Sequence, residues 1–430
     1  MTDIITTNDA LVAAIRGARG GETLLVGGDD WPRLDLSGLR PAGRVTIAPA
    51  DPASPPAFLT ASVRNCADLS FAGLLFDYRY RTTDKDWVKP FIFAGCSGLT
   101  FQGCVFDGDI ATGRPEAYAN GFAFGYGPDI ADCAGTTIEG CELVRWFNSL
   151  VMRRCTDTVI RGNRIHSGRM DALKLTGMTR VLIEGNDIRD FFTSLDSPDH
   201  CDMIQFFTNG TDAPSVGIII RGNTLDIGRG LYTQSIFMRN EEVDTGRQSF
   251  EAMAYRDVLI EENVIVNAQA HGITVGETIG LTIRNNTILH ADGGQPDGAD
   301  ASVEIPKINL KDASRDVLVE RNVTHPVWSM AQPWGRLNTA QPGWTVRDNL
   351  FWQDSDPAAP GHVSAYLVDG SWLPDADGAH RPQALLDGAV MAGGLGAARA
   401  RVRPVRRLLG TIEVWREPDG TVTQGKLIPA

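Results

Sequence analysis

The chain has 430 residues, and its 40 Lys+Arg against 53 Asp+Glu give a formal net charge of −13. This balance excludes a basic nucleic-acid coat and a polybasic membrane-surface protein. Charged residues make up 22% and hydrophobic residues 43%, which indicates a folded chain. The 46 glycines and the many β-branched residues favour an all-β fold, and no segment is apolar enough for membrane insertion.

The N-terminal segment predicts a cap for a β-structure. Residues 7–16 predict a short amphipathic helix with Thr7 or Asn8 as N-cap and with Leu11 and Ile15 on one face. A strand, ETLLV, follows it. The first residues lack the basic start and apolar run of a signal peptide. We therefore expect the chain to stay in the cytoplasm, to leave without a cleaved signal, or to be released with a particle.

Internal repetition is the strongest pattern in the chain. Ten segments, such as VLIEGNDI, IIIRGNTL and LTIRNNTI, follow one template of a short strand, two residues, usually Asn, and another strand. The Asn position is occupied by Leu74, Cys104, Cys141, Asn163, Asn186, Asn223, Asn263, Asn286, Asn322 and Asn349. Neighbouring members lie 22 to 40 residues apart. This period predicts a parallel β-helix in which the Asn amides bond from coil to coil.

Six of the seven cysteines fall on repeat positions. Two of them, Cys104 and Cys141, occupy the Asn position. The other four form a separate column: Cys66, Cys96, Cys133 and Cys155. We expect all six to stack inward as small hydrophobic residues and to remain free of disulfides.

These repeats resemble the pectin-lyase-like β-helix superfamily, which includes polysaccharide lyases, polygalacturonase-type hydrolases, alginate-acting enzymes and phage tailspikes. The resemblance covers roughly residues 20–352. It implies an all-β, single-stranded right-handed parallel β-helix of about ten coils. The expected division is a cap helix at 1–20, the β-helix at 21–352, and a C-terminal cap, attachment or oligomerisation segment at 353–430.

An earlier strand in each coil is predicted to carry two outward columns. The first reads Lys89, Asn120, Asn148, Asp171, Asp202, Gln234 and His271. The second reads Ile92, Ala123, Val151, Lys174, Gln205, Phe237 and Thr274. Because the parallel strands of neighbouring coils stack in register, the polar members of the middle coils should share one outer face.

This face and the insertions beside it supply the candidate site. The catalytic candidates are Asp171, Asp199, Asp202, His200 and His271. The substrate-binding candidates are Lys174, Gln205, Arg239, Glu241, Glu242 and Lys307. The alternative interpretation is structural: outward Asp and His can be solvating residues, His200 can stabilise a long loop, and the two glutamates can be loop charges.

Three segments, DALKL, DHCDMIQF and AHGITVGE, resemble the polygalacturonase-type motifs TDGI, GDDCIAI and GHGISIG. Carried over by position, Asp171 matches the first Asp, Asp202 and Asp199 match the pair, and His271 matches the motif His. Lys307 is the best match to the family's RIK motif. An extra coil separates Asp202 from His271, which shifts the histidine about 4.8 Å along the axis relative to the family pattern.

Two mechanisms are open at this stage. An inverting hydrolase needs two carboxyls about 6.5–9.5 Å apart, a role for Asp171 and Asp202. A lyase needs a base and a cation that neutralises a uronate carboxylate. Its candidates are Lys174, Arg239, Lys307 and His271. The mixed sign of the cluster favours a neutral or mixed-charge glycan.

We therefore predict a protein that binds and degrades a bacterial surface or extracellular polysaccharide, as a tail-fibre or tailspike component of a phage or phage-like particle. The alternatives are a non-enzymatic glycan receptor-binding or structural virion protein and a secreted polysaccharide lyase or uronan epimerase. No nucleic-acid partner is expected, and by resemblance the protein could be a trimer. No cofactor is predicted, although Ca²⁺ could bind to Asp-rich insertions. Those insertions hold Asp107, Asp109, Asp129, Asp292 and Asp297.

Overall fold

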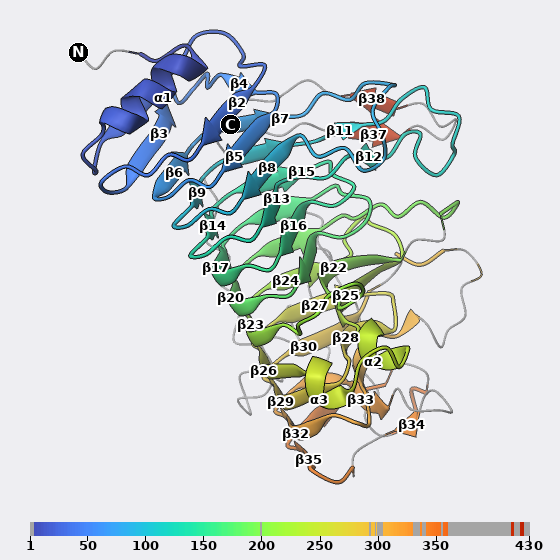
Figure 1. Cartoon of the computed structure of the whole chain (residues 1–430). Coiled ribbons are helices and arrows are strands. Elements are labelled where there is room, and N and C mark those ends of the chain that lie inside the picture. The colour runs from blue at the N-terminus through green and yellow to red at the C-terminus, as the bar shows by residue number, and fades with distance from the viewer. Residues whose placement is uncertain are drawn as a thin grey trace. The chain divides into compact units, whose positions relative to one another are not determined.

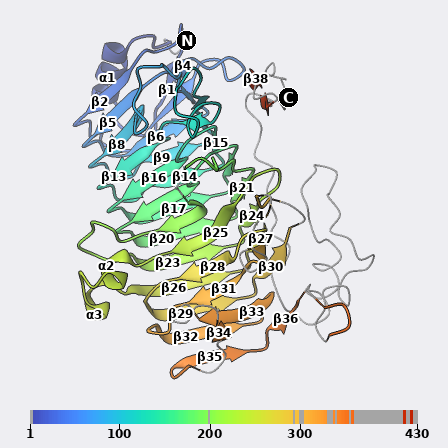
Figure 2. The same ribbon diagram turned by 90° about the vertical axis from the view of Figure 1, so that its right-hand side faces the viewer.

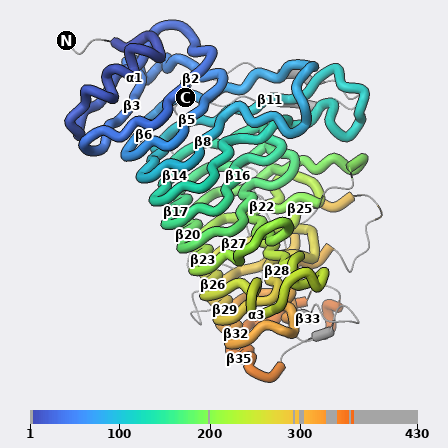
Figure 3. The backbone as a smooth tube through the Cα atoms, in the orientation of Figure 1, coloured from blue at the N-terminus to red at the C-terminus, as the bar shows by residue number. Residues whose placement is uncertain are grey.

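The computed structural model describes residues 4–197, 200–291, 294–296, 298, 304–329, 336–337, 341–353, 356–359, 414–416 and 422–424. The chain divides into two compact units. Of the described residues, unit 1 holds 4–169, 194–197, 414–416 and 422–424, and unit 2 holds 170–193 and those from 200 to 359. Each unit is a stack of parallel β-helix coils, which are visible as successive turns of the tube in Figure 3.

Unit 1 has three parallel sheets (Figure 1). Sheet A contains β1(Thr23–Val26), β3(Val45–Pro49), β6(Leu69–Ala72), β9(Thr100–Gln102), β14(Thr137–Glu139) and β17(Thr156–Arg161). Sheet B contains β4(Ala57–Phe58), β7(Leu75–Asp77), β10(Val105–Asp107), β15(Glu142–Val144) and β18(Arg164–His166). Sheet C contains β2(Leu34–Ser37), β5(Ala61–Arg64), β8(Phe91–Ala94), β13(Asp129–Ala131) and β16(Leu150–Arg153). A separate antiparallel pair consists of β37(Val414–Arg416) and β38(Val422–Gln424).

Unit 2 repeats the three sheets (Figure 2). Sheet A contains β20(Thr179–Glu184), β23(Val216–Arg221), β26(Tyr255–Glu261), β29(Thr278–Arg284), β32(Arg315–Glu320) and β35(Trp344–Arg347). Sheet B contains β21(Asp187–Arg189), β24(Thr224–Asp226), β27(Val264–Asn267), β30(Thr287–His290), β33(Val323–Ser329) and β36(Leu350–Phe351). Sheet C contains β19(Leu173–Thr176), β22(Cys201–Phe206), β25(Thr233–Met238), β28(His271–Val275) and β31(Lys307–Leu310), and β33 also pairs with β31. The short β34(Arg336–Leu337) runs antiparallel to β33.

The predicted N-terminal helix is present as α1(Asn8–Gly17). Thr7 is its N-cap, because the Thr7 hydroxyl accepts a hydrogen bond from the backbone N–H of Ala10 at 3.3 Å. Leu11 and Ile15 are buried, as their spacing predicts.

The predicted Asn ladder is also present, and it connects every coil of unit 2. The backbone N–H and the side-chain Nδ2 of Asn223 both donate to Asn263 Oδ1, at 3.0 and 2.9 Å. Asn263 makes the same two bonds to Asn286, and Asn286 to Asn322. Each buried Asn side chain therefore accepts hydrogen bonds from the preceding coil and donates one to the next, so that the buried polar groups of both coils have partners.

In unit 1, cysteine replaces asparagine over part of this column. Cys104 and Cys141 are fully buried, and the N–H of Cys141 donates to Asn163 Oδ1 at 2.8 Å. The separate cysteine column stacks in the same way, since the N–H of Cys66 donates to Cys96 Sγ at 3.4 Å. The N–H of Cys96 likewise donates to Cys133 Sγ at 3.4 Å, which confirms the predicted column. All seven cysteines, Cys201 outside the ladder included, are buried and free.

One strand assignment from the sequence is wrong. The sequence places Asn120 and Ala123 in the two outward columns and thereby predicts a sheet strand at 121–125. Instead β12(Ala123–Phe124) pairs antiparallel with β11(Asp109–Ile110), and β13 takes its place between β8 and β16. Both segments show strand-like alternation, but Phe124 packs edge-on against Tyr80 at 5.1 Å within the insertion. An alternation of apolar and polar residues can therefore come from a local hairpin that packs within an insertion, outside the sheets of the coils.

The insertion after β25 forms two short helices, α2(Glu241–Asp244) and α3(Phe250–Met253), which project beyond the strands in Figure 2. Their N-caps are Asn240 and Ser249, whose side chains accept backbone N–H bonds. None of the helices in the described part of the chain is long and apolar enough to cross a membrane.

Candidate functional site

Sheet C of unit 2 brings the two predicted columns together. Lys174 lies opposite Gln205, and the row continues through Phe237, Thr274 and Asn309. The second row passes from Asp171 and Asp202 to Gln234, His271 and Lys307, with a register irregularity after His271. Regular parallel pairing thus places acids, amides, a lysine and a histidine on one face.

Asp171 holds the start of this face in place. Lys174 Nζ donates to Asp171 Oδ2 at 2.6 Å, and the backbone N–H of Asp202 donates to Asp171 Oδ1 at 3.2 Å. The Asp171 side chain is fully buried, whereas that of Lys174 is 21% exposed. Both carboxyl oxygens therefore have partners, and the ion pair offsets the cost of burying the charge.

Asp202 is buried with only one of its two oxygens hydrogen-bonded. Gln205 Nε2 donates to Asp202 Oδ2 at 2.7 Å, while Oδ1 has no hydrogen-bond partner among the described residues. Burial raises the pKa of Asp202 to about 6, and the neighbouring Asp171 carboxylate adds to the shift. Its proton can therefore leave and return near neutral pH.

His200 connects this buried carboxyl to the surface. Its Nδ1 lies 3.3 Å from Asp202 Oδ2, and half of its side chain is exposed. The hydrogen bond to Asp202 raises the pKa of His200 above its ordinary value of 6.5. His200 and Asp202 thus form an acid–base pair with a buried member and an accessible one. Asp199, the other predicted acid of this loop, lies outside the described residues.

His271 is placed differently. Its Nδ1 lies 2.7 Å from Thr274 Oγ1, which also accepts a hydrogen bond from Asn309 Nδ2 at 3.1 Å. Burial lowers the pKa of His271 to about 4, so the ring is neutral at neutral pH. Burial also lowers the pKa of the neighbouring Lys307.

The extra coil predicted from the sequence separates the two histidines. Strand β25 pairs with β22 on one side and with β28 on the other. Its Phe237 ring lies between the imidazoles, with centroids 5.6 Å from His200 and 5.0 Å from His271. The structure therefore keeps His271 apart from the Asp202 carboxyl that it would adjoin in the family pattern.

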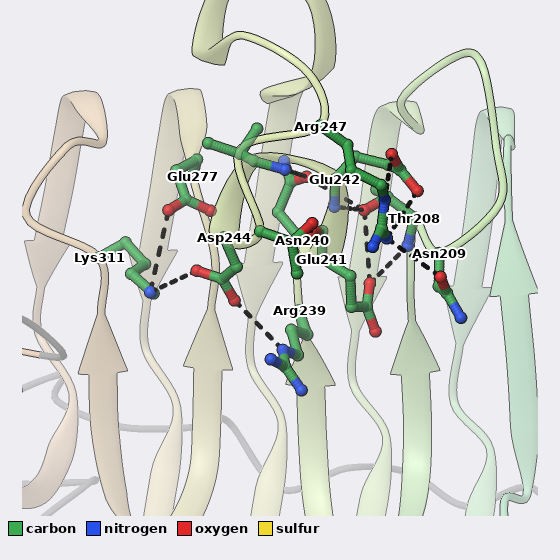
Figure 4. Close-up of polar contacts among 12 residues, drawn as sticks. Thr208, Asn209, Arg239, Asn240, Glu241, Glu242, Asp244, Arg247, Glu277 and Lys311 are labelled. Carbon is green, nitrogen blue, oxygen red and sulfur yellow. Dashed lines mark hydrogen bonds and ion pairs between the residues drawn. The ribbon is translucent and has the colours of Figure 1, made fainter.

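Arg239 belongs to a network at the end of β25 (Figure 4). Arg239 Nε donates to Asp244 Oδ2 at 3.2 Å, and Lys311 Nζ donates to Asp244 Oδ1 at 2.6 Å. Glu277 lies 3.9 Å from Lys311 and has one buried oxygen with no hydrogen-bond partner among the described residues. These contacts attach the α2 insertion to the coils.

The two predicted glutamates anchor the opposite side of the same insertion (Figure 4). Glu241 Oε2 accepts the backbone N–H of Thr208 at 2.9 Å, and Glu242 Oε1 accepts that of Gly210 at 2.9 Å. Arg247 also donates to Glu242 Oε1 at 2.9 Å. These bonds account for both residues structurally, and their substrate-binding role stays a prediction.

A family model described as the right-handed beta helix region matches residues 91–322, more than half of the chain. The chain belongs to the right-handed β-helix family. No curated protein sequence matches it.

Several solved β-helix structures are similar to the chain. PfbA, a surface adhesin of Streptococcus pneumoniae, is 12% identical with a TM-score of 0.45, over 82% of this chain and 90% of that one. The Dettilon tailspike protein is 15% identical with a TM-score of 0.47, over 84% of this chain and 66% of that one. DFA-IIIase from Arthrobacter chlorophenolicus A6 is 11% identical with a TM-score of 0.39, over 82% of this chain and 94% of that one.

Two further buried carboxyls lie on sheet B of this β-helix: Asp226, which sequence reasoning missed, and Asp107, which it named only as a candidate Ca²⁺ ligand. Burial raises the pKa of Asp226 in unit 2 to about 6, and that of Asp107 in unit 1 likewise to about 6. Both lie three residues after the Asn-column position, so this offset was the available signal. Asp107 pairs with Arg145 at 2.6 Å, whereas Asp226 Oδ2 has no hydrogen-bond partner among the described residues.

The predicted Ca²⁺ ligands do not form a cluster among the described residues. Asp107 is paired with Arg145, and Asp129 with Lys89 and Arg153. Asp292 and Asp297 lie outside those residues. The described part of the β-helix contains no group of three or more His, Cys, Asp or Glu arranged to hold a metal ion.

Replacing Asp202 by Asn is expected to raise the free energy of unfolding at pH 8, because an amide places no charge in this buried position. Since the folded-state pKa is raised from 3.8 to about 6, wild-type stability should fall as pH rises through that interval. The difference should therefore vanish below pH 3.8. Urea unfolding of both proteins across this range measures it, and equal stability at pH 8 would contradict the raised pKa.

Proposed function

We propose that unit 2 processes a polysaccharide by general acid–base catalysis, with His200 and Asp202 as the proton-transferring pair. A stack of parallel coils offers one long face, which suits a linear polymer. The resemblance of three segments on this face to polygalacturonase-type motifs supports a sugar polymer as the substrate. The expectation of a polysaccharide partner rests on these two points.

The geometry of the pair is the observation that carries this proposal. His200 is half exposed and can reach a substrate, while its Nδ1 faces the buried Asp202 oxygen at 3.3 Å. A buried carboxylate orients an imidazole and stabilises its protonated form, which allows the other ring nitrogen to exchange a proton with a sugar oxygen or carbon acid. Asp171 acts through Asp202, because its carboxylate bonds the Asp202 backbone and raises the pKa of Asp202.

The cations of the face have a complementary role. The partly exposed Lys174 ammonium lies 5.6 Å from the centre of the Phe207 ring, so a charge and an apolar surface are adjacent. Lys174 is the group best placed to neutralise a negative charge that develops on the substrate. His271 and Lys307 bound the face three and four strands beyond Lys174, on β28 and β31.

The geometry favours elimination or proton abstraction over inverting hydrolysis. The side chains of Asp171 and Asp202 are both fully buried, so neither carboxyl is placed to protonate a leaving group or to activate a water on a bound sugar, as an inverting pair must. Asp171 is also committed to Lys174 and to the Asp202 amide. A histidine that exchanges protons, on the same face as a lysine, instead matches the needs of a lyase or a uronan epimerase.

The test is incubation of the purified chain with bacterial capsule, lipopolysaccharide and uronate polymers, followed by product sizing. Shorter products with an unsaturated, ultraviolet-absorbing sugar would support elimination. New reducing ends without that absorbance would assign hydrolysis, and tight binding of intact polymer without products would reject the catalytic proposal.

The rate of polysaccharide processing is expected to show a bell-shaped dependence on pH. The active pair holds one proton, so activity should rise as Asp202 ionises near pH 6 and fall as His200 loses its proton above pH 6.5. Initial rates across pH 4 to 9 measure both limbs. Replacing Asp202 by Asn should move the upper limb down toward 6.5, because it removes the partner that raises the His200 pKa. An upper limb that does not move would separate His200 from Asp202.

The second candidate function is glycan binding without cleavage, as in a receptor-binding virion protein. The complete burial of the Asp171 and Asp202 side chains favours it, because neither carboxyl is accessible in this conformation. Assembly into a trimer or attachment to a particle through residues 353–430 remains a proposal, and most of that segment lies outside the described residues.

A further inference from the structure

We infer that unit 1 holds a separate binding site for an anionic saccharide. A pocket of about 570 Å³ opens beside sheet C at strands β2, β5 and β8. Its wall includes five cationic side chains and no carboxylate. They are Arg33, Arg64, Arg79, Arg81 and Lys89. The aspartates that pair with four of these cations are not part of the wall, so the lining itself is positive although the net charge of the chain is −13.

Arg33 and Arg64 are the cations that can turn to a ligand at small cost. Arg79 is paired with Asp30 and Asp77, and Lys89 is paired with the buried Asp129. The side chains of Arg33 and Arg81 are 61% and 72% exposed, and each pairs with one carboxylate, Asp35 or Asp84. The Arg33–Asp35 pair is exposed on both sides, and such a pair contributes only about 0–1 kcal/mol, so an incoming anion can replace Asp35. The Arg81 partner Asp84 is buried, so this arginine can bind a ligand only while it keeps its contact with Asp84. Arg64 has no carboxylate partner among the described residues. Its Nε donates to Ser62 Oγ at 3.3 Å.

The shape of the pocket selects a short anionic polymer segment. Its volume lies in the range of about 300–1,000 Å³ that is usual for ligand pockets, enough for a few sugar rings. Pro32, Leu59 and Pro90 supply apolar wall between the cations. Arginine forks bind carboxylate or sulfate groups through paired N–H bonds. Trp87, which is 66% exposed, directly precedes the lining residue Val88 and offers a ring for a sugar face.

The occupant that these features favour is a glycan that carries carboxylate or sulfate groups. A nucleic acid would extend phosphates from the pocket over the acidic surface around it, which electrostatic repulsion opposes. The site is built from unit 1 alone and does not involve His200 or Asp202. It therefore does not depend on whether unit 2 is catalytic.

Isothermal titration of the full chain tests this inference with four probes: oligogalacturonate, a heparin oligosaccharide, neutral maltohexaose and single-stranded DNA. The variant is the double substitution Arg64→Glu and Arg81→Glu. The control is Arg161→Glu, on β17 of sheet A, which is 45% exposed and pairs with Glu139 at 3.2 Å. We expect oligogalacturonate or heparin to bind, and the double variant to weaken that binding by about tenfold or more. Arg161→Glu should leave the affinity within about twofold.

The relative affinity for oligogalacturonate and heparin identifies carboxylate or sulfate as the bound group. Equal binding of maltohexaose, tighter binding of DNA, equal losses in the double variant and the control, or no binding of any probe would each overturn the inference. Pocket binding in a chain that cleaves no polymer would reject the catalytic proposal and leave this one standing.

Discussion

The Asp202→Asn variant is expected to lose activity on the polysaccharide by a factor of about 10²–10⁴ in kcat. The amide can still accept from Gln205, so the side chain should keep its place. It can no longer hold the negative charge that raises the pKa of His200 and stabilises the protonated ring. The loss should therefore appear in kcat with little change in KM, as expected for an interaction made during proton transfer.

Asp226→Asn is the matched control. Asp226 lies in the same unit, is 1% exposed, has a pKa raised by burial to about 6, and has one oxygen without a hydrogen-bond partner among the described residues. It lies on β24 of sheet B, away from the two polar columns of sheet C. An equal loss in both variants would mean that general destabilisation is the cause. Full activity of Asp202→Asn would remove Asp202 from the mechanism.

The Asn263→Ala variant is expected to lower the free energy of unfolding by about 3–5 kcal/mol. Its side chain accepts from both nitrogens of Asn223 and donates to Ile220 O and Asn286 Oδ1. Alanine would leave the backbone N–H and side-chain amide of Asn223 without this acceptor in a fully buried position. Urea denaturation followed by circular dichroism measures the loss.

Asn349→Ala provides the comparison at the end of the ladder. Asn349 accepts from Asn322 in the same way but is only partly buried. Water can replace part of what its side chain provides, so the loss should be at most about 1 kcal/mol. Equal losses at the two positions would show that the coil-to-coil bonds contribute no more in the interior than at the end.

The sequence was sufficient for the stacked features because each coil repeats the environment of the previous one. The Asn ladder, the cysteine column and the pairing of Asp202 with Gln234 all follow from one template in register. The insertion at 121–125 was misassigned because alternation alone does not separate a sheet strand from a local hairpin.

The protonation of the site could not be predicted in the same way. The burial of Asp202 and the exposure of His200 depend on how the chain packs over the face, which repeat spacing does not encode. The anchoring of Glu241 and Glu242 by backbone amides depends on the loop conformation before α2. Asp226 was missed because only titratable residues of sheet C were compared between coils.

Because the same Asn–Asn hydrogen bonds connect successive coils, the distance from His200 to His271 can change by the height of one complete coil. Asn223 bonds to Asn263 in the same way as Asn263 bonds to Asn286, so a chain that lacked one complete coil could form the same amide contact between the coils on either side. Such a deletion would remove Phe237 from between the rings and bring His271 one strand closer to Asp202. The repeated Asn contact thus allows whole coils to be lost or gained. Related chains could in this way acquire different distances between catalytic residues on different coils without a new fold.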